Sequence, residues 1–130
     1  MKHLGLPKTA LIRKPGEYQR IYAGGRRLRG DNFALVYRLA DAAPTKGQGP
    51  RMGISVSGVK SAVRRNRIKR IIREFFRLHR AAFNPALEMV FTVRRDFTLA
   101  TPAEIAAALA GITAGRAEIA RLPTVPKVQG

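Results

Sequence analysis

The order of apolar and polar residues predicts strands in three stretches of the chain and helices in three others. Strict alternation, which places successive side chains on opposite faces, runs through two of these stretches, and β-branched and aromatic residues mark a third. The predicted strands cover residues 32–40, 51–57 and 87–95. Apolar residues at helical spacing predict a short helix over 15–23, a long helix over 63–80 and a last helix that begins at Thr101.

The strand predicted over 51–57 indicates how the layers pack, because one of its faces is apolar and the other is small and polar. A sheet of such strands buries its apolar face against helices. We therefore expect an α+β fold in which a mixed β-sheet has its helices packed on one face. The 130 residues predict a single domain with an ordered core over about residues 11–113, between a loose N-terminal arm and a C-terminal tail.

The long helix divides into two faces when its residues are projected at about 100° per residue. Its apolar side would pack on the sheet and consists of Ile68, Ile71, Ile72, Phe75, Phe76, Leu78 and Ala82. Its opposite side is basic around Asn66 and carries Arg67, Lys69, Arg70, Arg73 and Arg77. Glu74 is the single acid in this helix, placed to pair with Arg70 or Arg77. A solvated helix face normally mixes both signs of charge, so we interpret this side as a surface that binds phosphate.

The charge of the whole chain supports a polyanionic partner. Lys and Arg number 25 against 8 Asp and Glu, which gives a net charge of +17. Such an excess destabilises the compact state by self-repulsion unless an anion offsets it. The longest apolar run, residues 105–114, is too short to span a bilayer, and the N-terminus shows no signal-peptide pattern. We therefore expect nucleic acid rather than a membrane as the partner. The absence of cysteine fits a cytoplasmic protein.

The residue types on the basic face suit RNA. Arginine outnumbers lysine there, and a guanidinium offers a planar fork to phosphate oxygens and can also stack on bases. Asn66 can both donate and accept hydrogen bonds, so it could meet a base edge or a 2′-hydroxyl. An equally good interpretation of Asn66 is a local cap near the start of the helix.

Tyr18 and Tyr22 lie one turn apart on the short helix, directly after Arg13 and Lys14. If this helix lies beside the open sheet face, its rings and cations would border a shallow groove that suits a single strand of nucleic acid. The floor of that groove would be Ala34, Val36, Gly53, Ser55 and Thr92. Burial of both tyrosines beneath the sheet is the competing interpretation.

No catalytic or metal-binding pattern is visible in the sequence. A nuclease needs paired carboxylates for metal ions or a histidine with a partner acid, whereas the eight acids here are scattered at spacings that form no ligand set. His79 falls on the apolar side of the long helix, where a structural role is expected. We therefore predict no cofactor bound by the protein and no catalytic residue.

At this point the residues resemble a known family. The stretch RMGISVSGVKSAVRRNRIKRIIREFFR, residues 51–77, is similar to the signature of the bacterial ribonuclease P protein, whose hallmark is the run Arg65-Asn66-Arg67. The order of elements agrees over roughly residues 11–113. The family has a ribosomal-protein-like fold, which implies a left-handed strand-helix-strand crossover in place of the usual right-handed one.

The resemblance implies the protein subunit of a ribonucleoprotein that removes the 5′ leader of precursor tRNA, with catalysis and magnesium at the RNA subunit and with no further protein partner required. The RNA-subunit contacts implied for this chain are Arg64, Arg65, Asn66, Arg67, Lys69, Arg70, Arg73 and Arg77. The leader contacts implied are Arg13, Lys14, Tyr18, Tyr22, Val36 and Lys60.

Two departures from the family pattern lower the charge and stacking expected in the leader cleft. Many relatives carry a Lys-Lys pair after the second strand, where this chain has Gly58-Val59-Lys60, and some relatives carry an aromatic residue where Val36 stands. The alternative function is a ribosomal or other structural RNA-binding protein, which the charge and fold would equally support. A protein-only nuclease is disfavoured by the scattered acids.

Overall fold

A computed structural model of the chain describes residues 10–40 and 49–122. Most of the predicted arm, the loop after the first predicted strand and the end of the tail lie outside the described residues. The elements in chain order are α1 (Pro15–Gly24), β1 (Arg26–Gly30), β2 (Phe33–Leu39), β3 (Arg51–Val56), α2 (Ala62–His79), the short 3-10 helix η3 (Arg80–Ala82), β4 (Leu87–Val93) and α3 (Pro102–Thr113). The predicted helices and strands are confirmed, and β1 is an additional strand.

The four strands form one mixed sheet in the order β1-β2-β4-β3. β4 runs antiparallel to β2 and parallel to β3, while β1 pairs antiparallel with β2 at one edge. The sequence RRLRG of β1 lacks an apolar face, since Leu28 is its one large apolar residue, so the pattern did not predict a strand. Backbone pairing with β2 holds β1 in place instead.

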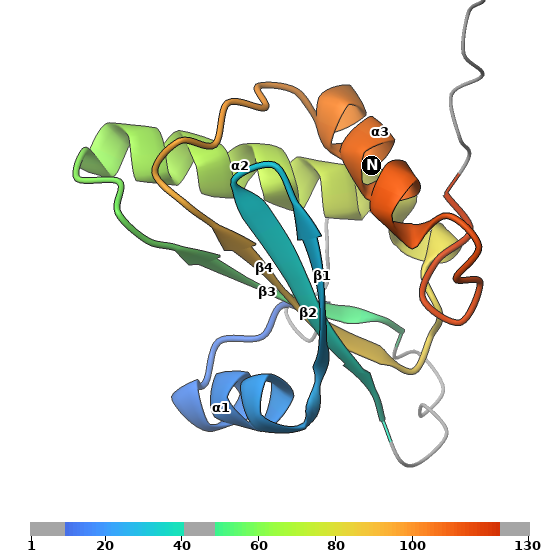
Figure 1. The fold of residues 1–130 in the computed structure, drawn as a ribbon. Helices are drawn as coiled ribbons and strands as arrows, with labels where there is room; N and C mark the ends of the chain where they lie inside the picture. The colour runs from blue at the N-terminus through green and yellow to red at the C-terminus, as the bar shows by residue number, and fades with distance from the viewer. Residues whose placement is uncertain (1–9, 41–48, 123–130) are drawn as a thin grey trace, which may run out of the picture.

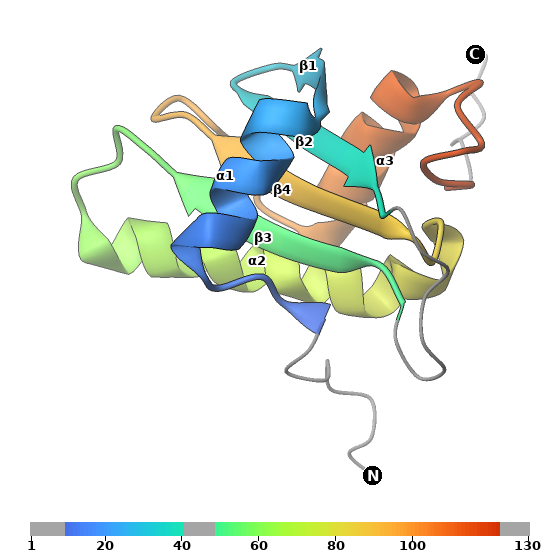
Figure 2. The same ribbon diagram turned by 90° about the horizontal axis from the view of Figure 1, so that it is seen from below.

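The helix α2 connects the parallel neighbours β3 and β4 across the sheet. In Figure 2 both strands run from right to left with β4 above β3, and α2 returns behind them, so the crossover is left-handed. This hand is rare among parallel connections. It was expected from the family resemblance and not from the pattern of residues.

The main core lies between the sheet and the helices α2 and α3, which cover the same face (Figure 1). Ile68, Ile72, Phe75 and Phe76 of α2 are buried there. Phe33 stacks on Phe91, and Phe97 meets both rings edge-on. The Nδ1 atom of His79 lies at hydrogen-bonding distance, 3.1 Å, from the Phe75 carbonyl oxygen, and the imidazole stacks on the Phe75 ring. The structural role predicted for His79 is therefore confirmed.

Leu78 is an exception to the predicted apolar side of the long helix, because 54% of its surface is exposed. Its position on the wheel lies at the edge of the stripe, and the neighbouring Arg77 and His79 are also partly exposed. The stripe that packs on the sheet is therefore narrower than predicted.

The first helix, α1, lies on the opposite face of the sheet from α2 and α3 (Figures 1 and 2). Ile12 and Ile21 form a small second core there with Val36 of β2 and Val90 of β4. The prediction that helices pack on one face thus holds for α2 and α3 and differs for α1. The reason is that β2 and β4 carry apolar residues on both faces, which gives α1 a place to pack.

Both ends of the described chain pack further than predicted. Ala10 and Ile12 are buried, and the Ile12 N–H donates to the Met52 carbonyl at 2.9 Å along the edge of β3. Beyond α3, Ile119 and Leu122 are buried, and the Arg121 N–H donates to the Ala82 carbonyl at 2.8 Å. The ordered core therefore extends past residue 113, because apolar residues resume after Gly115. In the part of the chain that the structure describes, no helix combines the length and apolar character needed to cross a bilayer.

Candidate nucleic-acid interface

The basic face belongs to α2, whose start is defined by a side-chain cap. The Ser61 hydroxyl accepts a hydrogen bond from the Arg64 N–H at 3.2 Å. This interaction is a standard N-cap, so the first turn does not need Asn66. The interpretation of Asn66 as a cap is therefore wrong, and its side chain is exposed one turn further along the helix.

Two arginines at the start of α2 turn back toward the protein. The Arg65 guanidinium donates to the carbonyls of Val59 and Lys60 at 2.8 and 2.9 Å. The Arg64 guanidinium donates to the Phe97 carbonyl at 2.9 Å. These contacts tie the segments before and beside α2 to the helix. Arg64 and Arg65 are thus engaged with backbone carbonyls rather than projecting freely into solvent.

Asn66 and the remaining basic residues of α2 form the surface that we call the α2 arc. Its basic residues are Arg67, Lys69, Arg70, Arg73 and Arg77. Arg77 pairs with Glu74, which lowers the pKa of that carboxyl. Arg67 and Arg70 are exposed and have no partner among the described residues. Glu74 is thus committed to Arg77, and the middle of the arc carries uncompensated positive charge on both sides of Asn66.

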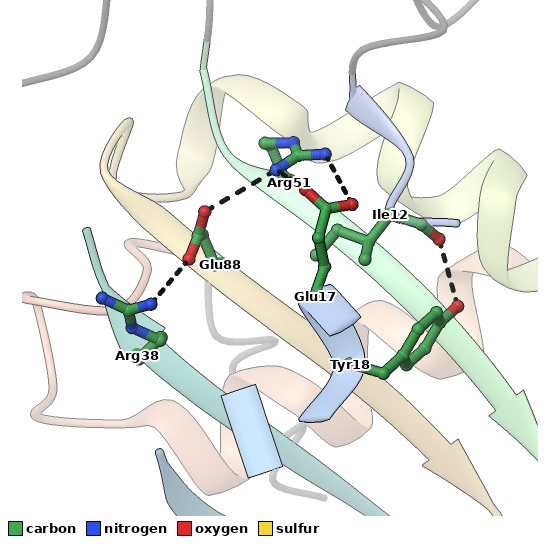
Figure 3. Close-up of polar contacts among 6 residues, drawn as sticks. All are labelled: Ile12, Glu17, Tyr18, Arg38, Arg51 and Glu88. Atoms are coloured by element: carbon green, nitrogen blue, oxygen red, sulfur yellow. Dashed lines mark hydrogen bonds and ion pairs between the residues drawn. The ribbon is translucent and has the colours of Figure 1, made fainter. Parts of the chain in front are cut away.

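The second predicted surface involves α1, where Tyr18 has a mainly structural position. Its hydroxyl donates to the Ile12 carbonyl at 3.1 Å (Figure 3) and accepts from the Ile54 N–H at 3.2 Å. Its ring lies on Gly53, where an added Cβ would come within 2.8 Å of it. Burial raises the pKa of the Tyr18 phenol, which keeps this hydroxyl protonated as a donor. Tyr18 therefore fixes α1 on the sheet and leaves only part of its ring exposed.

A chain of ion pairs holds the start of α1 at the same face (Figure 3). Arg51 of β3 lies between two carboxylates, at 2.8 Å from Glu17 and 3.7 Å from Glu88, and Arg38 lies 3.4 Å from Glu88. The hydrogen bond from Arg51 is the main cause that holds the pKa of Glu17 below its ordinary value of 4.5. This end of the face is therefore neutralised internally.

The other end of this face remains open beside Tyr22. The Tyr22 ring is 39% exposed, and its hydroxyl lies 3.4 Å from the Thr92 hydroxyl. Strand register places Ala34, Thr92 and Ser55 side by side across three strands. Thr92 and Ser55 are partly exposed and Ala34 is 7% exposed, and we call this strip of the sheet beside Tyr22 the groove. Of the two interpretations given for the tyrosines, the exposure of Tyr22 agrees with the one in which its ring borders the groove.

Two of the predicted floor residues do not belong to the accessible groove. Val36 is 2% exposed, because α1 covers it through Ile21, and Gly53 lies under the Tyr18 ring. The leader contact assigned to Val36 is therefore wrong in this structure. The alternation of the strand correctly placed both residues on this face, but it could not show where α1 crosses.

The predicted leader cations lie at two places. Arg13 and Lys14 are exposed just before α1, whereas Lys60 is exposed beyond the end of β3, and none of the three side chains forms a hydrogen bond or ion pair with another described residue. Three further arginines near the groove were missed: Arg27 and Arg29 of β1, and Arg94 after β4. They line a cavity of about 330 Å³ together with Thr92. Recognising RRLRG as a strand would have placed Arg27 and Arg29 on one face.

The described residues contain no group of three or more His, Cys, Asp or Glu that could hold a metal ion. The acids that come together, Glu17 and Glu88, share Arg51 between them and so serve as ion-pair partners. What the geometry offers is two cationic surfaces on opposite faces of the sheet, the α2 arc and the groove beside Tyr22.

Comparisons with known proteins agree in sequence and in structure. The family model described as Ribonuclease P matches residues 6–115. The chain is 46% identical over 113 residues to the ribonuclease P protein component of Desulfotalea psychrophila, which covers 86% of this chain and 90% of that protein. Identity to the protein of the same name from Syntrophus aciditrophicus is 39% over 95 residues, covering 72% and 76%.

Among solved structures, the RNase P protein from Staphylococcus aureus matches with a TM-score of 0.68 at 28% identity, covering 92% of this chain and 98% of that one. A second structure of the S. aureus protein matches with a TM-score of 0.65 at 29% identity. These similarities confirm the resemblance inferred from the sequence and the mixed α+β fold.

Proposed function

Because the chain belongs to the ribonuclease P protein component family, we propose that it docks on a ribonuclease P RNA through the α2 arc and holds the single-stranded 5′ leader of precursor tRNA in the groove beside Tyr22. Family membership itself gives the chain a role in tRNA 5′ processing, as part of an endoribonuclease with an RNA partner. In our proposal the RNA subunit, with its magnesium ions, carries the cleavage reaction.

The observation that carries this proposal is the separation of the two surfaces by the sheet. The α2 arc lies outside the main core, and the groove lies on the face that α1 only partly covers. A protein with this arrangement can contact a large RNA on one side and a second strand on the other without competition. Phosphate contacts supply affinity on both sides, and the exposed Tyr22 ring adds a surface for base stacking.

The α2 arc suits a structured RNA for electrostatic reasons. Arg67 and Arg70 carry charge that no described residue offsets, so phosphates can pair with them without first breaking an internal ion pair. Asn66 lies beside them on the exposed side of the helix, and its amide can donate and accept. Backbone phosphates would set the orientation, and Asn66 would contact a base edge or a 2′-hydroxyl.

The test is reconstitution of the cleavage reaction from purified parts. The protein, a bacterial ribonuclease P RNA and a precursor tRNA are mixed at low magnesium, and each component is omitted in turn. We expect the protein to increase leader removal by the RNA and to cleave nothing on its own. Cleavage by the protein alone would show a protein-only nuclease, and a lack of stimulation would favour a structural RNA-binding protein.

A further inference from the structure

The edge strand β1 presents a row of arginines to the same sheet face as α1. Register pairs Arg27 with Val36 and Arg29 with Ala34, and both of these partners face the α1 side. Side chains opposite each other in a ladder point to the same face. Arg26 belongs to the other face, because successive residues of a strand alternate. Arg27 and Arg29 therefore extend the groove floor to the edge of the sheet.

These two arginines meet Arg94 around the cavity of about 330 Å³. Its remaining lining comprises Phe33 and the small or polar residues Gly30, Asn32, Ala34, Ser57 and Thr92. No acidic residue lines this cavity, and the three arginine side chains are exposed without a partner among the described residues. Three like charges therefore surround one hollow, and no described carboxylate forms an ion pair with them.

The lining specifies the chemistry of an occupant. A guanidinium has five donors and no acceptor, so three of them require a ligand rich in acceptor oxygens. Phosphate provides such oxygens in a geometry that matches the planar guanidinium fork. The hydroxyls of Ser57 and Thr92 add neutral partners, whereas the Asn32 amide donates to the Asp96 carbonyl at 3.1 Å. The volume lies at the lower end of the range of small-ligand sites, about 300–1,000 Å³, so a phosphate fits together with its attached sugar.

The cavity is continuous with the groove through Thr92. This residue lines the cavity and also places its hydroxyl 3.4 Å from the Tyr22 hydroxyl. A strand with a base on the Tyr22 ring would thus pass directly over Thr92 toward the β1 arginines. We infer that Arg27, Arg29 and Arg94 form a phosphate subsite for the RNA strand that lies in the groove, an inference that rests on the proposed function.

The decisive measurement is affinity as a function of leader length. The complex of protein and ribonuclease P RNA is titrated with mature tRNA and with precursor tRNAs whose leaders increase one nucleotide at a time. For the native protein we expect affinity to rise with leader length until the strand fills both groove and cavity. In the double variant Arg27→Ala/Arg29→Ala the last rise should disappear, a weakening of about tenfold for long leaders.

A matched variant, Arg26→Ala/Arg116→Ala, removes the same charge from exposed positions outside the cavity. It should retain the full dependence on leader length. In the Arg27→Ala/Arg29→Ala variant, by contrast, the slope of log affinity against log salt for long leaders should fall by about 0.7 for each phosphate contact that is lost. The single variant Arg94→Ala provides an independent check, because Arg94 follows β4 and its removal does not affect pairing of the edge strand.

The outcomes separate the subsite from the proposed function. If the native complex binds precursor and mature tRNA equally, the proposed function fails. If the native complex prefers long leaders, and both the cavity variants and the matched variant retain that preference, the subsite is refuted while the proposed function stands. Equal losses in the cavity and matched variants would also refute it, since they would show a general effect of charge.

Discussion

Neighbouring arginines in the Arg65-Asn66-Arg67 run have different surroundings, although the sequence treats them alike. Arg65 donates to two backbone carbonyls of the loop before α2, at 2.8 and 2.9 Å. Arg67 is exposed, and its side chain forms no hydrogen bond or ion pair with a described residue. A hydrogen-bonded guanidinium contributes to folding, and an exposed one is available to a ligand. The motif therefore combines a structural anchor with a binding position.

This difference gives a prediction for two alanine variants. Arg65→Ala should lower the free energy of unfolding by about 1 kcal/mol, because two carbonyls lose their donor. Arg67→Ala should change it by less than about 0.5 kcal/mol, as is usual for exposed positions. Denaturant unfolding of both variants measures the two values. An equal loss of stability in the two variants would contradict the structural assignment.

The same pair is then compared in binding to the ribonuclease P RNA. Arg67→Ala should reduce the slope of log affinity against log salt by about 0.9 if Arg67 contacts one phosphate of a duplex. Glu104→Gln, a change at an exposed position of α3, provides a control for effects away from the α2 arc. A slope for Arg67→Ala equal to that of the native protein would argue against a phosphate contact.

At the scale of elements, the docking of α1 defines the groove, and it depends on polar contacts as well as on apolar burial. Its small core contains Ile12, Ile21 and the two sheet valines, and the Glu17–Arg51 pair and the Tyr18 hydroxyl add specific contacts. Since α1 determines which sheet residues remain open, a change at the ion pair should affect both stability and the groove.

The pH dependence of this docking follows from the lowered pKa of Glu17. A carboxyl whose pKa is lowered by folding contributes stability that is present above its unfolded value of 4.5 and is lost as the pH falls through the folded value. Glu17→Gln should therefore destabilise the protein at neutral pH, by less than about 1 kcal/mol for a pair that solvent still reaches. The difference from the native protein should shrink as the pH falls below 4.5 and through the lowered folded pKa of Glu17.

Thermal melts of the native protein and of Glu17→Gln between pH 3 and pH 7 measure this difference. Glu118→Gln serves as the matched control, because the Glu118 side chain is exposed and forms no ion pair with a described residue. A difference for Glu17→Gln that is the same at all pH values would refute the electrostatic contribution.

The elements that the pattern predicted, and the one it missed, have a common physical explanation. Strands with an apolar face and helices with an apolar stripe are visible in sequence because burial imposes a period. β1 is held by backbone pairing at an edge, which imposes no such period, so Arg27 and Arg29 were not placed. Val36 was given the correct face but the wrong exposure, because the position of α1 depends on contacts distant in sequence.

For the whole molecule, the dominant property is a net charge of +17 on a domain with two open cationic surfaces. The α2 arc and the β1 arginines are both positively charged and lie on different faces. Each surface therefore needs its own anion to offset its charge. The sequence predicted the excess of charge and the arc, since both follow from residue identity and helical period. It could not predict the cavity around Arg94, which is assembled from residues of β1, β2 and β4 and from residues that flank the strands, including Ser57 after β3.

Multivalent anions should therefore stabilise the free protein. An anion that binds only the folded state raises the free energy of unfolding according to its concentration relative to its dissociation constant, by about 2.7 kcal/mol at a hundredfold excess. Melts in increasing phosphate should show a rising midpoint. Sodium chloride at matched ionic strength provides the control for screening, and an equal rise in both salts would exclude bound phosphate as the cause.

The position of β4 in the sheet has a consequence for biosynthesis. β4 is the last strand in the chain, yet it lies between β2 and β3 and is the neighbour through which β3 joins the sheet. A nascent chain that has not reached residue 87 can form the hairpin of β1 and β2. Without β4, however, β3 has no strand to pair with, and α2 has no complete sheet to pack on. Folding of this domain must therefore await the synthesis of β4, and chains released earlier would expose apolar strands to aggregation and proteolysis.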